Sequence, residues 1–209
     1  RGDMSIILYT TEYMQIREKQ KGLIAKAFTP TLWKKETSYS TNDIVKPTKD
    51  NGHYYRCISA GKSGEEEPKW TTGFWDEIED GTVKWREEEP VYILDSEPAD
   101  FSYPCVIVGN ITPMAEIQKA TGNQPATDLI TYVLIKSYQL DNKTYNQIRF
   151  QAYDVLKQVQ NVIRENTTLG GFSGVLRATG GLYTLPDTLP VFFEIQQSWV
   201  VRLLVKKEG

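Results

Sequence analysis

The side chains able to carry metal or acid–base chemistry are few in this chain. Its 209 residues include one histidine, His53, which follows the turn-forming run 50–52. A zinc site takes several His, Cys or carboxylate ligands, and neither a second histidine nor a nearby ligand cluster accompanies His53 in the sequence. We therefore predict that the chain has no metal site.

Motifs for nucleophilic catalysis or phosphate binding are also missing from the sequence. Residues 170–174 (GGFSG) resemble a phosphate loop in glycine content, but they follow a predicted helix, whereas a phosphate loop precedes one. A helix C-cap followed by a hairpin explains them better. The carboxylate runs 65–67 and 87–89 are interpreted as solvated loops and edge protection. Nothing places a nucleophile beside a base, so we predict a protein that is not an enzyme and has no catalytic residue or cofactor.

The composition is that of a folded protein without a strongly charged surface. Hydrophobic residues make up 40% and charged residues 24%, and the formal net charge is −3. This charge argues against a strongly basic nucleic-acid binder, and no apolar run approaches the ~20 residues that span a bilayer. The two cysteines, Cys57 and Cys105, fall in different predicted modules and are expected to be small core residues in a reducing compartment.

A change in composition marks an inserted module at residues 31–90. This stretch holds four of the five tryptophans, many turn-forming residues and no helical periodicity. Its 9 Lys and Arg against 13 Asp and Glu give a net charge of −4, whereas the remaining 15 against 14 give +1. We therefore predict a small all-β domain at 31–90, inserted into a body formed by residues 1–30 and 91–209.

A first helix is predicted in the body over residues 12–28, with Thr10 or Thr11 as its N-cap. Its apolar stripe includes one polar position, Gln20. The apolar members of the stripe are Ile16, Leu23 and Ala27.

The strongest helix prediction covers residues 143–165. Apolar residues recur there at intervals of three and four, so they share one face of a helix. These residues are Ile148, Ala152, Val155, Val159 and Val162. The residues expected to point away from that face are Gln151, Asp154, Lys157, Gln158 and Arg164.

Strand patterns fill most of the remaining body. They lie at 91–94, 105–108, 130–136 and 191–205, with a glycine-rich hairpin at 175–182. In the last strand apolar and polar side chains alternate, and Gln197 is the single polar residue on the apolar face. The predicted fold class is α+β: a mainly antiparallel sheet flanked by two helices, with a small all-β inserted domain.

Several short motifs of the body follow one another in a recognisable order. Residues 101–108 (FSYPCVIV) form a proline-led strand, residues 156–162 belong to the long helix, and 166–171 (NTTLGG) form a turn before a hairpin and a long last strand. In this order, over about 10–30 and 91–207, the chain resembles the tail terminator proteins of long-tailed bacteriophages. The resemblance implies a sheet flanked by helices that assembles as a closed ring, typically a hexamer. The large insert departs from that family's pattern.

The insert carries a second resemblance. Trp33 is followed by 39–45 (YSTNDIV), 54–57 (YYRC) and 67–70 (EPKW), and 80–85 would form a closing strand after a turn. This series is similar to the small chitin-binding modules (carbohydrate-binding type 5/12) of bacterial chitinases, versions of which occur as additions to phage virion proteins. The aromatic residues that the resemblance makes candidates for carbohydrate binding are Trp33, Tyr55, Trp70, Trp75 and Trp85.

Two interpretations of these aromatic residues are open. Their flat apolar faces could stack on sugar rings while neighbouring acceptors bind hydroxyl groups. Alternatively, most of them form the core of a domain of about 60 residues, which needs large side chains to be stable. Chitinase modules expose adjacent aromatic residues, and the insert has no adjacent tryptophan pair. Core packing is therefore the favoured interpretation.

The function that these resemblances imply is structural. We expect a virion protein of the phage tail and neck, assembled in the host cytoplasm, which forms a ring at the head-proximal end of the tail. Its expected partners are further copies of itself, the tail tube protein and head–tail connector proteins, with no specific nucleic-acid binding and no membrane. The alternatives are another neck or head-completion ring protein, or a carbohydrate-binding host-recognition protein. A recognition protein is expected to carry its module at one end of the chain, whereas this module interrupts the body.

Overall fold

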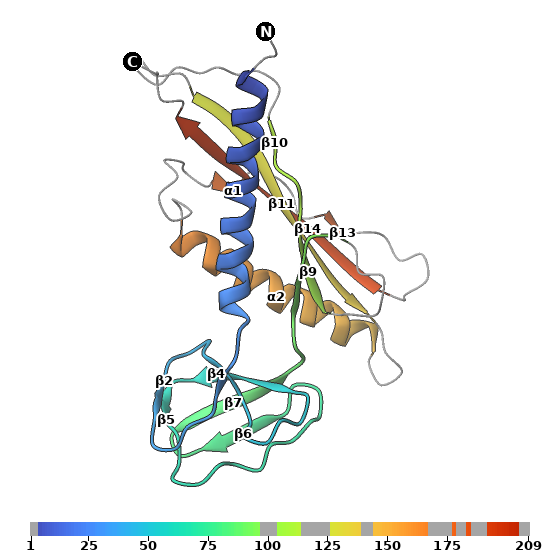
Figure 1. The fold of residues 1–209 in the computed structure, drawn as a ribbon. Helices are drawn as coiled ribbons and strands as arrows, with labels where there is room; N and C mark the ends of the chain where they lie inside the picture. Colours follow the sequence, from blue (N-terminus) through green and yellow to red (C-terminus); the bar gives the residue numbers. More distant parts are fainter. Residues whose placement is uncertain are drawn as a thin grey trace. The chain divides into compact units, whose positions relative to one another are not determined.

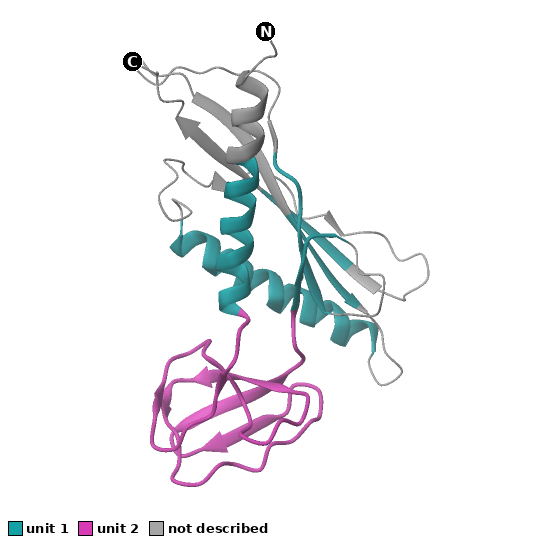
Figure 2. Cartoon of the chain, in the orientation of Figure 1, with its two compact units in different colours: residues 1–27, 92–209 teal, residues 28–91 magenta. Residues whose placement is uncertain are grey.

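A computed structural model describes residues 4–96, 104–113, 126–138, 144–166, 177–178, 183–184 and 192–204. The chain has the predicted α+β class (Figure 1). Contacts divide it into two compact units, one formed by residues 1–27 and 92–209 and the other by residues 28–91 (Figure 2). We call the first unit the body and the second the inserted unit. Of the described helices, none combines the length and the apolar character needed to cross a bilayer.

The first helix of the body, α1 (Met4–Ala27), begins earlier than predicted. Thr10 and Thr11 lie inside it, so neither is its N-cap. The residues before Thr10 include no proline or glycine after Met4, so nothing in that segment stops the helix. The buried stripe also differs: Ile16, Gln20 and Ile24 are fully buried at intervals of four, whereas Leu23 and Ala27 are half-buried.

The second helix, α2 (Tyr145–Glu165), matches its prediction closely. Thr144 is the N-cap: its hydroxyl accepts the N–H of Gln147, and the Gln147 side chain accepts the N–H of Thr144. Such a capping box satisfies two backbone donors that the first turn leaves free. The buried residues of this helix are Ile148, Gln151, Ala152, Val155, Leu156, Gln158, Val159 and Ile163.

Two glutamines of α2 were wrongly predicted to point away from the body. Gln151 and Gln158 are both buried. The hydroxyl of Ser137 donates to Gln151 Oε1, and Gln158 Nε2 donates to Asp154 Oδ2 at 2.8 Å. Hydrogen-bonded amides can thus widen the buried face beyond the apolar stripe that the sequence shows.

The body sheet is built on two long strands. Strand β11 (Ala126–Tyr138) pairs antiparallel with β14 (Phe192–Leu204) over 13 residues each. From β12 (Arg177–Ala178), the sheet order is β12-β14-β11-β9-β8, and β8 (Tyr92–Leu94) runs parallel to β9 (Cys105–Val108). The short strand β10 (Thr112–Pro113) also pairs with β11. The main sheet is therefore mostly antiparallel, and α2 contacts both long strands (Figure 1).

The predicted hairpin at 175–182 lies largely outside the described residues. Of the hairpin itself the structure describes β12 (Arg177–Ala178), and β13 (Tyr183–Thr184) follows directly after it; each of the two pairs antiparallel with β14. Both short strands therefore lie on the side of β14 opposite β11.

Polar contacts tie the helices of the body to its sheet. The predicted exception on the apolar face of β14, Gln197, is buried, and its Oε1 accepts Gln160 Nε2 of α2 at 3.2 Å. On α1, Arg17 donates to the carbonyl of Val108 at 3.1–3.2 Å and lies 2.8 Å from the carboxylate of Asp95. These contacts join α1 to the end of β9 and to the residue that follows β8.

The inserted unit is all-β, with one five-stranded sheet in the order β1-β3-β4-β7-β6 and a small β2-β5 pair. Its strands are β1 (Thr31–Leu32), β2 (Ser38–Tyr39), β3 (Ile44–Lys46), β4 (Tyr54–Ser59), β5 (Gly61–Lys62), β6 (Glu77–Asp80) and β7 (Val83–Glu88). Strands β6 and β7 form a hairpin around Gly81, whose φ of +61° and close approach to the Lys62 carbonyl both require glycine.

Candidate functional site

Most of the candidate carbohydrate-binding residues lie in the core of the inserted unit. Tyr55 and Trp85 are fully buried and Trp33 is 7% exposed, while Trp70 is partly buried against the same cluster. The rings of Tyr55 and Trp70 lie 4.2 Å apart between centroids, and those of Trp70 and Trp85 lie 6.1 Å apart. Rings packed in this way stabilise a small core and offer little open face to a sugar.

A buried carboxylate, which the sequence did not single out, holds two of these tryptophans. Asp80 Oδ2 accepts the indole N–H groups of Trp33 at 2.8 Å and of Trp85 at 2.9 Å, and Oδ1 accepts the backbone N–H of Gly64 at 2.7 Å. Asp80 is 4% exposed because it follows Ile78 on the inward-facing side of β6. We call Asp80 with Trp33 and Trp85 the indole–carboxylate cluster.

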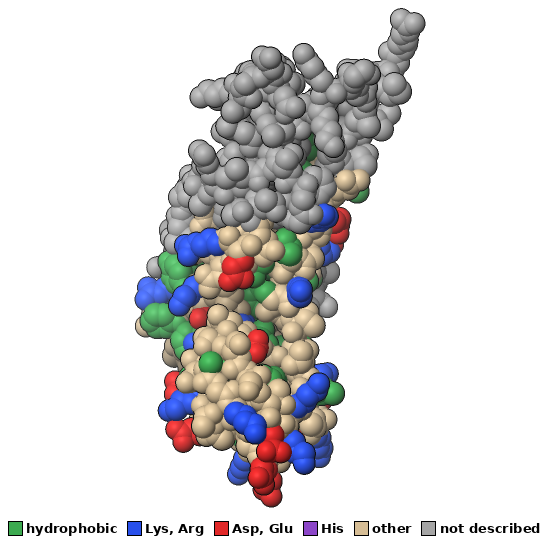
Figure 3. All heavy atoms as spheres, turned by 90° about the vertical axis from the view of Figure 1, so that its left-hand side faces the viewer, with side chains coloured by type: hydrophobic (Ala, Val, Ile, Leu, Met, Phe, Trp, Pro, Cys, Tyr) green, Lys and Arg blue, Asp and Glu red, His purple; other side chains and the backbone are tan. Residues whose placement is uncertain are grey.

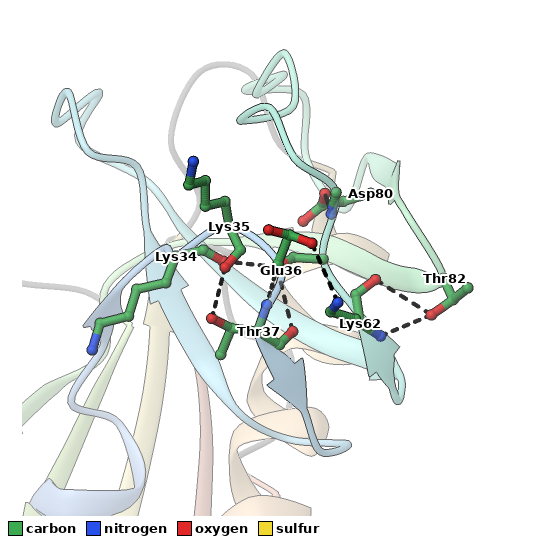
Figure 4. A network of polar contacts seen from close by, with 9 residues as sticks. Lys34, Lys35, Glu36, Thr37, Lys62, Asp80 and Thr82 are labelled. Carbon is green, nitrogen blue, oxygen red and sulfur yellow. Dashed lines mark hydrogen bonds and ion pairs between the residues drawn. The ribbon is translucent and has the colours of Figure 1, made fainter.

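The Gly64 contact belongs to a wider polar network around the loop 34–37 (Figure 4). The hydroxyl of Ser63 donates to the Lys34 carbonyl at 2.7 Å and accepts the N–H of Thr37 at 2.9 Å. Lys62 Nζ lies 3.4 Å from a carboxylate oxygen of Glu36. The ammonium groups of Lys34 and Lys35 point away from the network in Figure 4. The network therefore holds the backbone of this loop.

Trp70 and Tyr55 are held by further polar partners at the margin of the core. Trp70 Nε1 donates to Glu67 Oε1 at 2.9 Å, and the same carboxylate accepts the N–H of Thr48. Burial alone would raise the pKa of Glu67, but the hydrogen bonds from Thr48 and Trp70 hold it below its ordinary value. The Tyr55 hydroxyl donates to the Thr71 carbonyl at 2.9 Å, and burial raises the pKa of this phenol.

Trp75 lies outside the described core cluster. The residue is half-buried, and its ring stacks with that of Phe74 at a centroid distance of 5.0 Å and an angle of 16°. The guanidinium carbon of Arg86 lies 4.8 Å from the Trp75 ring centroid, within the range of a cation–π contact. The backbone of Trp75 has a φ of +62°, in the left-handed region that tryptophan seldom adopts.

The run 87–89 was wrongly interpreted as a solvated carboxylate loop. Strand β7 alternates, so Val83, Trp85 and Glu87 face the interior, and Glu87 is 1% exposed. Glu88 lies on the other side, where Arg56 Nε binds it at 2.8 Å and Arg86 Nη2 at 2.7 Å. In the run 65–67, by contrast, the first two residues are exposed.

The buried carboxylate of Glu87 has two partners. Its Oε1 lies 2.6 Å from Nδ1 of His53, and its Oε2 accepts the backbone N–H of Trp75 at 2.9 Å. Burial raises the pKa of Glu87 above its ordinary value, and these hydrogen bonds offset part of the rise. A histidine–carboxylate pair can orient an imidazole for proton transfer. Here the second oxygen of the carboxylate accepts a backbone N–H, so Glu87 also holds the loop that contains Trp75.

The described part of the chain contains no group of three or more His, Cys, Asp and Glu side chains placed to hold a metal ion. Both cysteines are buried thiols outside any disulfide, and burial raises the pKa of Cys57. The polar residues that link separate segments of the inserted unit are Asp80, Glu87 and His53. A signal for the first two was present in the sequence, because each follows buried residues at the two-residue spacing of a strand.

Searches of known protein-family models and of curated proteins find no match to this sequence. The resemblances to tail terminators and to chitin-binding modules therefore stay predictions. What the structure adds is the α+β body, the all-β inserted unit and the contacts within each.

Proposed function

We propose that this protein is a structural component of a phage virion that forms a closed ring at the head-proximal end of the tail, as tail terminators do. The observation that carries the proposal is the body itself. Its helix α2 contacts an antiparallel pair of 13-residue strands, in the chain order of helix, strands, helix and last strand on which the resemblance rests. The proposed partners are further copies of this chain, the tail tube protein and head–tail connector proteins.

The contacts of the polar side chains support a structural role over a catalytic one. The buried carboxylates Asp80 and Glu87 bind N–H groups of their own unit, and Gln197 binds a glutamine of α2. On the face shown in Figure 3, the acidic and basic side chains of the described residues are interspersed. Such a surface favours protein contacts over non-specific binding to the phosphates of nucleic acid.

The test is the mass and shape of the assembly. The purified full chain should be examined by native mass spectrometry and negative-stain electron microscopy, alone and with tail tube protein. Closed rings form when a heterologous contact closes by rotation, so we expect a single ring size, either alone or on the tube. A chain that remains monomeric with tube protein present would refute the proposal. A ring that binds connector proteins but not tube protein would favour another neck or head-completion protein.

Carbohydrate binding is the second candidate, and the position of Trp75 favours it. This residue is the one candidate aromatic placed outside the core cluster of the inserted unit. Binding to chitin and to a glycan array should be compared between the wild type and Trp75→Ala. Specific binding that is lost in the variant, with unchanged thermal stability, would support host recognition. Equal retention of both proteins would count against a sugar site at Trp75.

A further inference from the structure

The loop between β3 and β4 contains an asparagine that is followed by a glycine. Asn51 and Gly52 are the one Asn–Gly pair in the sequence, and both residues are exposed. In such a pair the backbone nitrogen of the glycine can attack the side-chain amide carbon of the asparagine, because glycine has no side chain to hinder the approach. The pair therefore combines a reactive sequence with access to water.

The reaction of such a pair needs water alone. Gly52 N loses its proton to the solvent as it bonds to Asn51 Cγ, and the bond from Cγ to Nδ2 then breaks as Nδ2 takes up a proton and leaves as ammonia. Water opens the resulting succinimide ring at either carbonyl. One product is aspartate, and the other is isoaspartate, in which the main chain runs through the former side chain. In both, an amide and water have become a carboxylate and an ammonium ion.

The folded turn holds each of the polar groups that take part. Gly52 N–H donates to Asp50 Oδ1 at 2.8 Å. Asn51 Nδ2 donates to the hydroxyl oxygen of Tyr55 at 2.8 Å, and Asn51 Oδ1 accepts the backbone N–H of His53 at 3.1 Å. The amide of Asn51 is thus fixed at its nitrogen and at its oxygen, while the attacking nitrogen is held by a third hydrogen bond.

The contact with Asp50 opposes the first step of the reaction. Loss of the proton from Gly52 N would place a negative charge on a nitrogen 2.8 Å from a carboxylate oxygen, and like charges so close repel each other. The contact with Tyr55 rests on a firm support, since Tyr55 is fully buried and its hydroxyl donates to the Thr71 carbonyl. The closed turn is therefore an unreactive arrangement of a reactive pair.

We propose that Asn51 is a latent self-modification site, which the folded turn protects and which converts to aspartate or isoaspartate when the turn opens locally. Either product lacks the amide N–H that Asn51 donates to Tyr55, and it adds a carboxylate beside Asp50. Isoaspartate also lengthens the main chain just before His53, which contacts Glu87. The modification would loosen the start of β4 and mark inserted units that have opened. This proposal is independent of ring formation.

Peptide mapping of the full-length protein by mass spectrometry, after incubation at mildly alkaline pH, tests the site. The peptide that contains residues 51–52 should show the exchange of NH₂ for OH, and electron-transfer fragmentation distinguishes isoaspartate from aspartate. The same chain unfolded in guanidinium chloride gives the unprotected rate. We expect the folded protein to react at least about tenfold more slowly, because local opening must precede the reaction. Equal rates in the two states would overturn the proposal, and so would an unfolded chain that does not react at Asn51.

A variant of Asp50 separates protection by the turn from a general effect of folding. Asp50→Ala removes the acceptor of Gly52 N–H at an exposed position, and we expect the folded variant to react about fivefold faster, as for the loss of one exposed hydrogen bond to a charged group. Lys46 Nζ lies 3.6 Å from Asp50 Oδ2, so Lys46→Met removes that ion pair, keeps the carboxylate and is the matched control. It should react as the wild type does.

The rate of each variant is divided by its own rate in guanidinium chloride, which removes any effect on intrinsic reactivity. A folded Asp50→Ala protein that reacts no faster than the wild type and Lys46→Met would overturn the proposal. Circular dichroism checks that the variants fold. If Asp50→Ala does not, Tyr55→Phe takes its place, since it keeps the buried ring but removes the partner of Asn51 Nδ2. An unchanged rate in that variant would have the same meaning.

Discussion

The inserted unit and the body bury polar groups in different ways. In the inserted unit the buried polar groups include the carboxylates of Asp80 and Glu87, which accept N–H groups from tryptophan side chains and backbone. In the body most of the buried polar side chains that the structure describes are neutral, such as Gln197, which links α2 to the sheet, and the buried charge of Lys136 is paired with Glu194. Removing one partner of a buried charge leaves a larger desolvation cost than removing one partner of an amide. The small unit should therefore be the more sensitive to single substitutions.

The indole–carboxylate cluster should show the largest effect. Asp80→Ala leaves the N–H groups of Trp33, Trp85 and Gly64 buried without their acceptor, so we expect the inserted unit to lose about 3 kcal/mol or more of its free energy of unfolding. Urea denaturation followed by tryptophan fluorescence measures this loss, because four of the five tryptophans lie in residues 31–90. Glu79→Ala, an exposed neighbour on β6, is the matched control. Equal midpoints for the two variants would show that the cluster is not a major source of stability.

A smaller effect is expected in the body. Gln197→Leu removes the acceptor of Gln160, but Gln160 is only half-buried and water can replace the bond. The expected cost is about 1 kcal/mol, the usual net value of a neutral hydrogen bond. Thermal unfolding followed by circular dichroism measures it, with Asn146→Leu at an exposed position of α2 as the control. A loss as large as that of Asp80→Ala would remove the contrast between the two units.

In the inserted unit, the change of the free energy of unfolding with pH should reflect the raised pKa of Glu87. Its pKa is raised in the folded state, mainly by burial, so its contribution is fully present below the unfolded pKa and is lost as pH rises through the folded pKa. The wild type should therefore gain stability relative to Glu87→Gln as the pH is lowered from neutral toward the ordinary range of glutamate. Urea midpoints of both proteins at several pH values give the difference. A difference that is independent of pH would contradict the assigned shift.

In the body, the contribution of Asp95 to stability should change with pH in the opposite direction, and it should be the smallest of these effects. The hydrogen bond from Lys21 and the charge of Arg17 lower the pKa of Asp95, so its contribution is present above the unfolded pKa and is lost as pH falls through the folded one. The Asp95 side chain is 52% exposed, which limits the contribution to about 1 kcal/mol or less. Asp95→Asn should reduce thermal stability slightly at neutral pH, and the reduction should shrink in acid or in high salt. A reduction that persists unchanged in acid would point to a cause other than this ion pair.

Periodicity made the main elements of the body predictable. The spacing of apolar residues from Ile148 to Val159 corresponds to α2, and the alternation around Ile195 corresponds to β14. The start of α1 was missed because Thr10 is a good cap residue, although nothing before it stops the helix. Local patterns therefore identify elements better than they identify their ends.

The polar contacts of the inserted unit could not be predicted in the same way. Asp80 binds an indole 47 positions earlier in the chain, and Glu87 pairs with a histidine 34 positions earlier. In a sequence each is one of many acidic residues, and an acidic residue is most often exposed. Alternation along the strand marks them as inward-facing, but only the tertiary structure supplies the donors that make burial tolerable.

The ion pairs between α1 and the end of β8 have a consequence for the order of folding. Arg17 and Lys21 meet Asp95 across 78 and 74 positions of sequence, and the inserted unit occupies the span between them. In an unfolded chain, bringing the two ends of such a span together is entropically costly and slow. An insert that collapses first converts this long flexible loop into a compact one. We therefore expect the tryptophan-rich inserted unit to fold before α1 docks on the body. Early folding of the insert would then lower the entropic cost of bringing α1 to Asp95.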